Sequence, residues 1–141
     1  MATFNKFNSF VQAVGTKVHN LNAADVLKVI LSNAAPVATN TVLANITQIA
    51  NGNGYTTNGT TTAATYTNSS GTSKLVCADV VFTSVTGNMG PFRYVVLYNS
   101  TATNGELIGW WDYGSNVTLN GLAAETFTVD FDGSNGVLTI V

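Results

Sequence analysis

The sequence predicts an all-β fold: an antiparallel β-sandwich of the jelly-roll kind, with a short amphipathic helix or arm at the N-terminus, residues 1–20. Two observations lead to this expectation. Thr is abundant and favours strands, while the many Asn and Gly residues favour turns. In the second half of the chain, short apolar runs alternate with turn residues at regular spacing, and no helical periodicity separates them.

Length and composition indicate one domain, residues 1–141. A chain of 141 residues has the size of a single domain with one core. Hydrophobic residues make up 45% of it and charged residues 9%, against about 25% charged residues in a typical soluble domain. Disordered chains combine low hydrophobicity with high net charge, so this composition predicts a packed fold with a polar, nearly uncharged surface.

The N-terminal segment shows helical periodicity. Its large apolar residues recur at spacings of three and four: Phe4, Phe7, Val11, Val14 and Val18. Thr3 is a plausible N-cap, and Gly15 weakens the later turns by up to about 1 kcal/mol relative to Ala. The predicted helix either covers one end of a sheet or forms an arm that docks on a neighbouring subunit.

The middle of the chain contains one clear strand signal. Residues 26–31 form a short β-branched run, which predicts the first strand. Residues 36–49 are ambiguous and leave room for a single helical turn. Residues 51–73 are mainly Asn, Gly, Thr and Ser, punctuated by Tyr55 and Tyr66, and are expected to form a long loop or a pair of edge strands.

After residue 73 the strand signals become dense. The expected strands are 74–82, 92–98, 107–113, 126–131 and 137–141, with turns at 87–91, 120–121 and 132–136. One of them shows strict alternation of apolar and polar residues: Phe127, Val129 and Phe131 alternate with Thr126, Thr128 and Asp130. Because successive strand residues point to opposite faces, this pattern predicts a strand with one buried face and one solvent-exposed face.

The sequence offers no convincing catalytic, cofactor or metal site. His19 is the single histidine and lies where the predicted N-terminal helix ends, a place where an imidazole is structurally useful. Cys77 is alone within an apolar run and is expected to be a buried, unreactive thiol. Residues 130–136 resemble a calcium loop superficially, but Gly136 falls one position too late and Val141 stands where Glu is required.

Charge and hydropathy exclude two classes of partner. The net charge is −2, and the five cations are scattered as Lys6, Lys17, Lys28, Lys74 and Arg93, so no basic surface is expected to bind nucleic acid. No run of about 18 apolar residues predicts a membrane span, and the N-terminus lacks the apolar stretch of a signal peptide. We therefore expect a protein made in a cytoplasm and free of membranes.

The pair Trp110-Trp111 allows two interpretations. Flat aromatic rings with polar edges can form a carbohydrate-binding platform. However, neighbouring strand residues face opposite sides of a sheet, so one tryptophan is expected to enter the core and the other to remain available for a protein partner. We favour the second interpretation.

Several stretches together carry a family resemblance: residues 1–8, 90–99, 107–115 and 125–132. They resemble a family of small virion structural proteins of tailed bacteriophages. The resemblance implies a non-enzymatic particle component, and among such components a head decoration, or cement, protein. Such a protein would bind major capsid protein on the capsid exterior after synthesis in the bacterial host cytoplasm. A tail or head-fibre protein is the alternative.

The cement role is physically coherent with the composition. A small stiff module that binds several subunits at once gains avidity through effective concentration, and low charge reduces the desolvation cost of polar contacts. A homo-oligomer, trimeric or dimeric, fits capsid symmetry. The residues expected to contact the major capsid protein or copies of the chain itself are aromatic: Phe4, Phe7, Phe10, Tyr55, Tyr66, Trp110 and Trp111.

Overall fold

The protein is an antiparallel all-β structure, as the sequence predicted. The structure, a computed structural model, describes residues 2–22 and 24–141. Strands make up 46% of it and helices 7%, which confirms the predicted class. Its elements are β1 (Phe4–Lys6), α1 (Ser9–Gly15), β2 (Leu27–Ser32), the 3-10 helix η1 (Leu43–Asn45), β3 (Thr60–Thr62), β4 (Ala64–Ser69), β5 (Thr72–Cys77), β6 (Val80–Thr83), β7 (Met89–Asn99), β8 (Leu107–Leu119), β9 (Thr126–Val129) and β10 (Leu138–Ile140).

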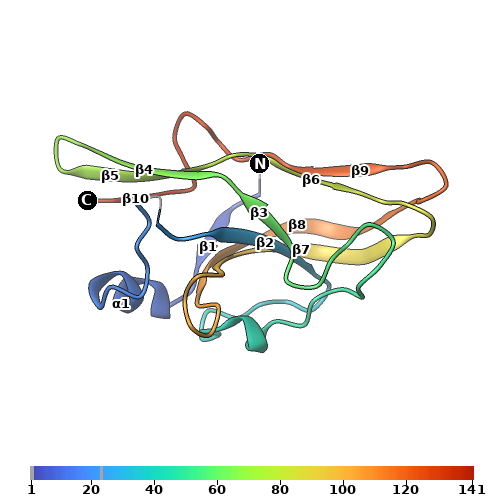
Figure 1. Ribbon diagram of the computed structural model, residues 1–141, viewed down its shortest axis with the longest axis horizontal. Coiled ribbons are helices and arrows are strands. Elements are labelled where there is room, and N and C mark those ends of the chain that lie inside the picture. The colour runs from blue at the N-terminus through green and yellow to red at the C-terminus, as the bar shows by residue number, and fades with distance from the viewer. Residues whose placement is uncertain (1, 23) are drawn as a thin grey trace.

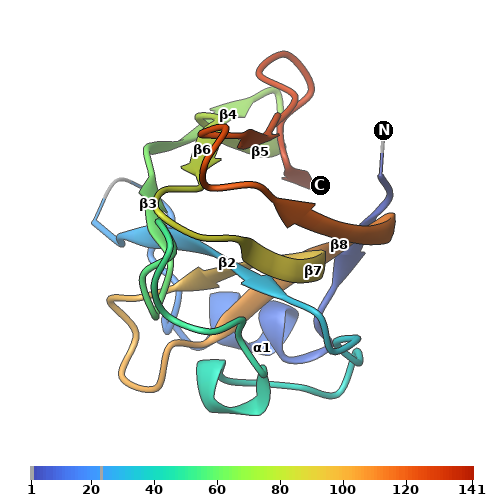
Figure 2. The same cartoon turned by 90° about the vertical axis from the view of Figure 1, so that its right-hand side faces the viewer.

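The strands form two layers. One layer is a five-stranded sheet in the order β1-β8-β7-β2-β3, and all its pairings are antiparallel. The other contains the three-stranded sheet β10-β5-β4 and the strand pair β6-β9. Figure 1 shows these two smaller sheets side by side above the five-stranded sheet, and Figure 2 shows the same layers after a quarter turn.

The central strands bury both of their faces. Along β2, Val29 and Leu31 enter the apolar cluster between the layers, whereas Ile30 enters a second cluster on the outer face of the five-stranded sheet. The outer cluster consists of Phe7, Ile30, Ile46, Val96, Tyr98 and Leu107. The loops around η1 lie along this outer face, where Leu43 packs against the cluster, whereas α1 packs through Phe10 on the cluster between the layers (Figure 1). Burial on both faces explains why this strand is a continuous apolar run rather than an alternating one.

The N-terminal prediction was partly wrong. Residues 4–6 form the edge strand β1, which pairs with β8, and the helix is confined to Ser9–Gly15. Asn8, not Thr3, occupies the N-cap position. The helix buries Phe10 and Ala13 and leaves Val11 59% exposed, so the predicted stripe is not the buried face. Pairing with a distant strand outweighs local periodicity here because the edge of β8 offers backbone partners.

The polar segment 51–73 contains strands at two sheet edges. β3 ends the five-stranded sheet and β4 ends the three-stranded one, with only Ala63 between them. The chain therefore crosses from one layer to the other at this residue. Gly59, which precedes β3, has a φ of +72°, and a β carbon there would collide with the carbonyl oxygen of Val29. A glycine is required for this close approach.

Several strand limits differ from the prediction. The expected strand 74–82 is divided at Asp79, whose side chain accepts a hydrogen bond from the backbone of Phe131 at 2.9 Å. Strands β7 and β8 are longer than expected, and the turn assigned to 87–91 ends before Met89. Side-chain hydrogen bonds and bulges set these limits, and neither follows from an apolar pattern.

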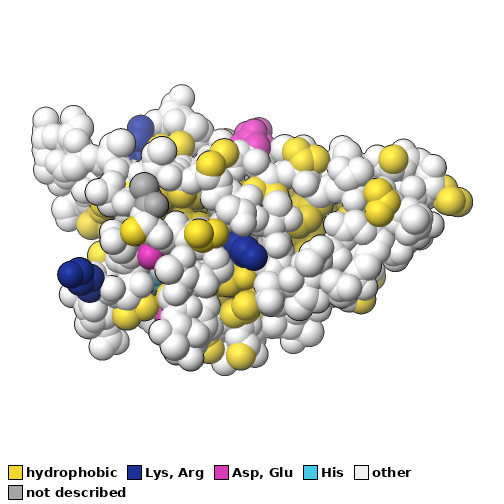
Figure 3. Space-filling model, in the orientation of Figure 1, with side chains coloured by type: hydrophobic (Ala, Val, Ile, Leu, Met, Phe, Trp, Pro, Cys, Tyr) yellow, Lys and Arg dark blue, Asp and Glu magenta, His cyan; other side chains and the backbone are white. Residues whose placement is uncertain are grey.

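The surface carries few charges. Figure 3 shows a face that is mostly uncharged, with the charged side chains far apart. Within the described ranges, one ion pair is present: Arg93 donates to both carboxylate oxygens of Asp112 at 2.7 and 2.9 Å. No helix in those ranges has the length and hydropathy that crossing a membrane requires.

Candidate functional site

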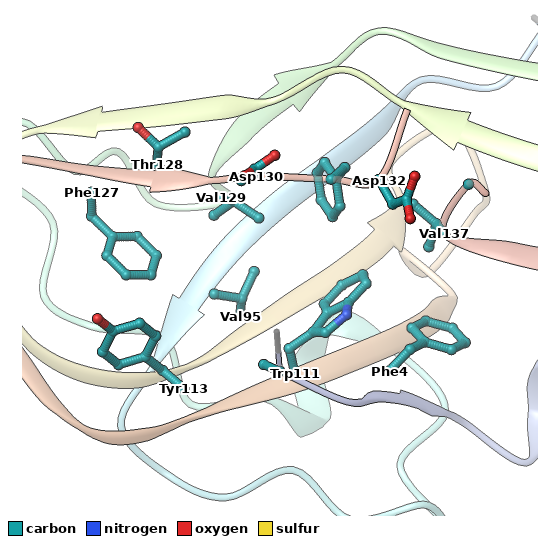
Figure 4. A pocket seen from close by; sticks show the side chains of 13 residues that line it. Phe4, Val95, Trp111, Tyr113, Phe127, Thr128, Val129, Asp130, Asp132 and Val137 are labelled. Atoms are coloured by element: carbon teal, nitrogen blue, oxygen red, sulfur yellow. The ribbon is translucent and has the colours of Figure 1, made fainter. Parts of the chain in front are cut away.

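An aromatic cleft of about 540 Å³ opens between the two layers along one side of the protein. It is lined from the five-stranded sheet by Phe4, Val95, Trp111 and Tyr113, and from the other layer by Phe127, Val129, Phe131 and Val137. Thr128, Asp130 and Asp132 also border it, and the side chains of Thr128 and Asp130 point away from the aromatic rings (Figure 4). Figure 4 shows the aromatic side chains of β8 and β9 pointing toward one another across this cleft.

The strand period places the aromatic rings. Trp111 and Tyr113 lie two residues apart on β8 and so share a face. Phe127 on β9 reaches the ring of Tyr113, with centroids 5.4 Å apart and planes at 79°. This edge-to-face geometry is a favourable aromatic arrangement. Tyr113 nevertheless remains 54% exposed, so the mouth of the cleft is accessible from solvent.

Trp111 is the centre of the cleft wall. Its ring lies 5.2 Å from that of Phe4 and 5.4 Å from that of Phe131. The pairing of β1 with β8 sets Phe4 directly opposite Trp111, which brings the N-terminal aromatic residue into the site. The cleft thus joins segments from both ends of the chain.

Two carboxylates at the cleft differ in their surroundings. Asp132 accepts hydrogen bonds from the backbone of Asn135 at 2.7 Å and of Ser134 at 2.8 Å, and from the side-chain amide of Asn135. These bonds, first those from Asn135, hold the pKa of Asp132 below its usual value. Asp130 is exposed on the wet face of its strand. Residues 132–136 form the turn that the sequence predicted.

A second hollow of about 400 Å³ continues the cleft past Phe4. It lies between α1, β1 and β10 and is lined by Phe4, Lys6, Phe10, Val11, Val14, Leu138, Thr139 and Ile140. Phe4 lines both hollows, which therefore lie next to each other, and we call the two together the open-side groove. Lys6 is the charged residue of the second hollow.

The strands that border this groove have free backbone edges. Among the strands of residues 2–22 and 24–141, β1 pairs only with β8, β9 only with β6, and β10 only with β5. β8 pairs with β1 at Gly109–Trp111, and its later residues pair with β7 alone. Unpaired edges of this kind present rows of backbone donors and acceptors to any segment that approaches.

The seven aromatic residues that the sequence assigned to partner contacts lie in different surroundings. Phe4 and Trp111 line the cleft. Phe7, Phe10 and Tyr55 are at most 3% exposed and pack inside the protein, so their assignment to an exposed partner surface is corrected, although Phe10 also forms part of the floor of the second hollow. Tyr66 on β4 is half-buried against the core between the layers. Aromatic residues dominate cores as well as interfaces, which is why composition did not separate the two.

Trp110 and Trp111 face opposite sides of β8, as predicted. Trp110 packs on Phe7 in the outer cluster, with ring centroids 4.5 Å apart. Trp111 packs against the cluster between the layers. Both are half-buried, so neither is wholly committed to the core. Only Trp111 opens onto the groove.

His19 is buried in a hydrogen-bonded network outside the groove. Its Nδ1 lies 3.1 Å from the side-chain nitrogen of Asn99, which also donates to Asp25 at 2.6 Å. The side-chain oxygen of Asn99 accepts from the backbone of Thr101 and Ala102, which fixes the amide orientation. Nδ1 is therefore an acceptor. Burial lowers the pKa of His19, against the opposing effect of Asp25.

The remaining candidates for covalent or metal chemistry are isolated. Cys77 is buried, and this burial raises the pKa of its thiol to about 12. The thiolate is the nucleophilic form, so the native thiol is unreactive near neutral pH. Within residues 2–22 and 24–141, no group of three or more His, Cys, Asp or Glu side chains is arranged to hold a metal ion.

Tyr113 and Phe127 are the site residues that the sequence interpretation missed. Each lies on an expected strand, and Tyr113 stands two positions after Trp111. The period of two therefore contained a signal for their shared face. That β8 and β9 would face each other across an opening is a property of the sheet arrangement.

Comparisons of the chain with protein-family models, with curated proteins and with solved structures find no match.

Proposed function

We propose that this chain is a non-enzymatic structural protein of a tailed-bacteriophage virion, and within the virion a decoration protein that binds and stabilises the shell of major capsid protein. The virion setting rests on the sequence resemblance described above. The observation that carries the binding role is an apolar, aromatic groove on one side of a protein whose surface carries few charges. Contiguous exposed apolar surface of this kind is typical of protein-binding sites.

The finer fold description that belongs to this proposal is a β-sandwich. The apolar cluster between the two layers supports it. A jelly-roll connection of the strands stays a prediction, to be tested by comparing an experimental structure strand by strand.

The arrangement of titratable groups favours binding over turnover. His19 is sequestered with its Nδ1 occupied, and the Cys77 thiol has a pKa of about 12. The carboxylate of Asp132 is committed to its own turn. General acid and base catalysis needs a titratable group within hydrogen-bond reach of substrate, and the groove wall is mainly apolar.

The proposal is tested with expanded shells of the major capsid protein of the same phage. We expect the purified protein to bind them at a fixed number of copies per shell, on the exterior near symmetry axes, and coated shells to melt at a higher temperature. Sedimentation, cryo-electron microscopy and calorimetry measure these three properties. Recovery of the protein only with tails or head fibres would reject the decoration role and support the alternative virion location.

A carbohydrate-binding module is a second candidate because the cleft presents the flat rings of Trp111 and Tyr113. A glycan array tests it. Binding that is lost on Trp111→Ala but kept on Trp110→Ala supports this candidate, because Trp110 faces the other side of β8. If the protein binds no glycan on the array, the result argues against this candidate.

A further inference from the structure

We propose that the open-side groove accepts an extended segment of the shell protein, which adds as a β-strand to the outer edge of β9 and β10. This inference rests on the proposed function for the identity of the partner. It assigns a docking mode to a surface that the decoration role leaves unspecified. The mode is strand addition, in which backbone hydrogen bonds give affinity and alternate side chains enter pockets.

The first argument is the unequal width of the two layers. One sheet has five strands, whereas the layer above it is three strands wide at β10-β5-β4 and two strands wide at β6-β9. The upper layer therefore covers β8 and β1 only in part: Ile108 of β8 is buried between the layers. The partly covered face carries Trp111, Tyr113 and Phe4, which line the cleft. A strand added beside β9 and β10 would lie over these rings.

The second argument is the free edge itself. β9 pairs with β6 on one side and β10 pairs with β5 on one side, and no strand of the described residues lies on the outer side of either. Residues 130–137 connect β9 to β10 as a loop. Figures 1 and 2 both show this loop rising away from the five-stranded sheet. The base of the loop, through Phe131 and Val137, lines the first hollow. The unpaired edges offered to a partner strand are therefore those of Thr126–Val129 and Leu138–Ile140, on either side of the loop.

The third argument is the shape and chemistry of the groove. Its two hollows, of about 540 and 400 Å³, meet at Phe4 and follow β9 and then β10. A long apolar floor below a free strand edge matches an extended segment in which alternate side chains are apolar. A glycan would need more polar partners than this floor supplies, because Asp132 is engaged in its own turn.

Charges at the two ends specify the segment further. Asp130 lies at the β9 end and Lys6 at the β10 end. In the described part of the chain the Arg93–Asp112 pair is the one ion pair, so neither Asp130 nor Lys6 is neutralised there. Complementarity then favours a segment with Lys or Arg over Asp130 and Asp or Glu over Lys6. The expected occupant is thus an alternating apolar strand with opposite charges at its ends.

The test uses overlapping peptides of about 15 residues, longer than a typical strand, tiled across the major capsid protein that the same phage encodes. Binding is measured by fluorescence anisotropy on the intact chain. We expect one tile to bind, to slow amide hydrogen exchange at Thr126–Val129 and Leu138–Ile140, and to carry the charges given above. Protection at these two segments is the signature of an added strand.

Matched variants separate the groove from the rest of the surface. Tyr113→Glu places a charge in the cleft, whereas Val81→Glu places one outside it at nearly the same exposure, 54% against 53%. We expect Tyr113→Glu to weaken tile binding about tenfold or more and Val81→Glu to change it by less than about twofold. Asp130→Lys is the second variant and should also weaken binding of the peptide. Replacing the basic residue of the peptide with an acidic one should restore the affinity for this variant. Both positions are exposed, so folding should survive.

The outcomes distinguish the docking mode from the function. Two outcomes would overturn the added strand and leave the decoration role intact. In one, shells bind the protein but no peptide does. In the other, a peptide binds and neither Tyr113→Glu nor Asp130→Lys changes its affinity. Self-association in sedimentation that Tyr113→Glu abolishes would assign the groove to a second copy instead. Failure of the shells themselves to bind would reject the decoration role.

Discussion

The ring of Phe127 meets the ring of Tyr113 edge-on across the open side of the protein, with centroids 5.4 Å apart and planes at 79°. The two residues belong to strands of different layers, β9 and β8. They form one contact between the layers at the mouth of the cleft, and the contact of Trp111 with Phe131 forms another deeper in it. The rings of Tyr113 and Phe127 are the first apolar surface that an incoming partner would meet, because Tyr113 is more than half exposed.

The contact of Tyr113 with Phe127 should contribute measurable coupling between the layers. We expect a double-mutant cycle of Tyr113→Ala and Phe127→Ala to give a coupling energy of about 0.5–1.5 kcal/mol in urea unfolding, the range for a well-oriented aromatic pair. Tyr113→Phe is the control and should keep the coupling, because the ring contact does not need the hydroxyl. Strictly additive single variants would show that the two rings do not interact in solution.

The corrected N-terminal helix makes opposite predictions for two neighbouring residues. Phe10→Ala should lower the free energy of unfolding by about 3–5 kcal/mol, because it leaves a cavity around a buried ring, while Val11→Ala should change it by less than about 0.5 kcal/mol. Chemical denaturation measures both. The helical stripe expected from sequence spacing predicts a large effect at Val11, so equal losses at the two positions would restore that interpretation.

The buried His19 should make stability depend on pH. Burial lowers its pKa in the folded state from 6.5, although the nearby carboxylates of Asp25 and Glu106 oppose this shift. The unfolded chain therefore binds the proton more readily, and protonation favours unfolding. The contribution of neutral His19 is complete above pH 6.5 and is lost as the pH falls from there through the lower folded pKa.

Urea midpoints measured between pH 8 and pH 4.5 should therefore fall on the acid side of the ordinary histidine value. His19→Gln should flatten this part of the profile, because glutamine does not titrate. The lowered pKa values of Asp112 and Asp132 act elsewhere: they are held down by hydrogen bonds, first from Arg93 and from Asn135 respectively. Their contributions are lost only as the pH falls below the ordinary aspartate value of 3.8. A wild-type profile as flat as that of His19→Gln would contradict the buried neutral imidazole.

The thiol of Cys77 should be protected in the folded protein. With a pKa of about 12 and a buried side chain, it should react with iodoacetamide at pH 8 only as fast as the protein opens. Mass spectrometry should therefore find an unmodified native chain and a singly modified chain in denaturant. Reaction of the native protein at the rate of a free thiol would place Cys77 at the surface.

Part of the candidate site was within reach of the sequence. The opposition of Trp110 and Trp111 follows from the strand period, and the same period links Trp111 to Tyr113. The place of Phe4 beside Trp111 was out of reach, because it depends on pairing between the two ends of the chain. Phe7 and Phe10 carried the same apolar signal as Phe4, and only their burial shows that they belong to the core.

The sequence by itself determined the all-β class, the alternation along residues 126–131 and the turn at 132–136, because these depend on neighbours in the chain. Tertiary structure decided that residues 4–6 form a strand and that the smaller layer covers β8 and β1 only in part. Both outcomes depend on which distant strand edges meet, and the free energy of that choice is shared between segments that no local pattern connects.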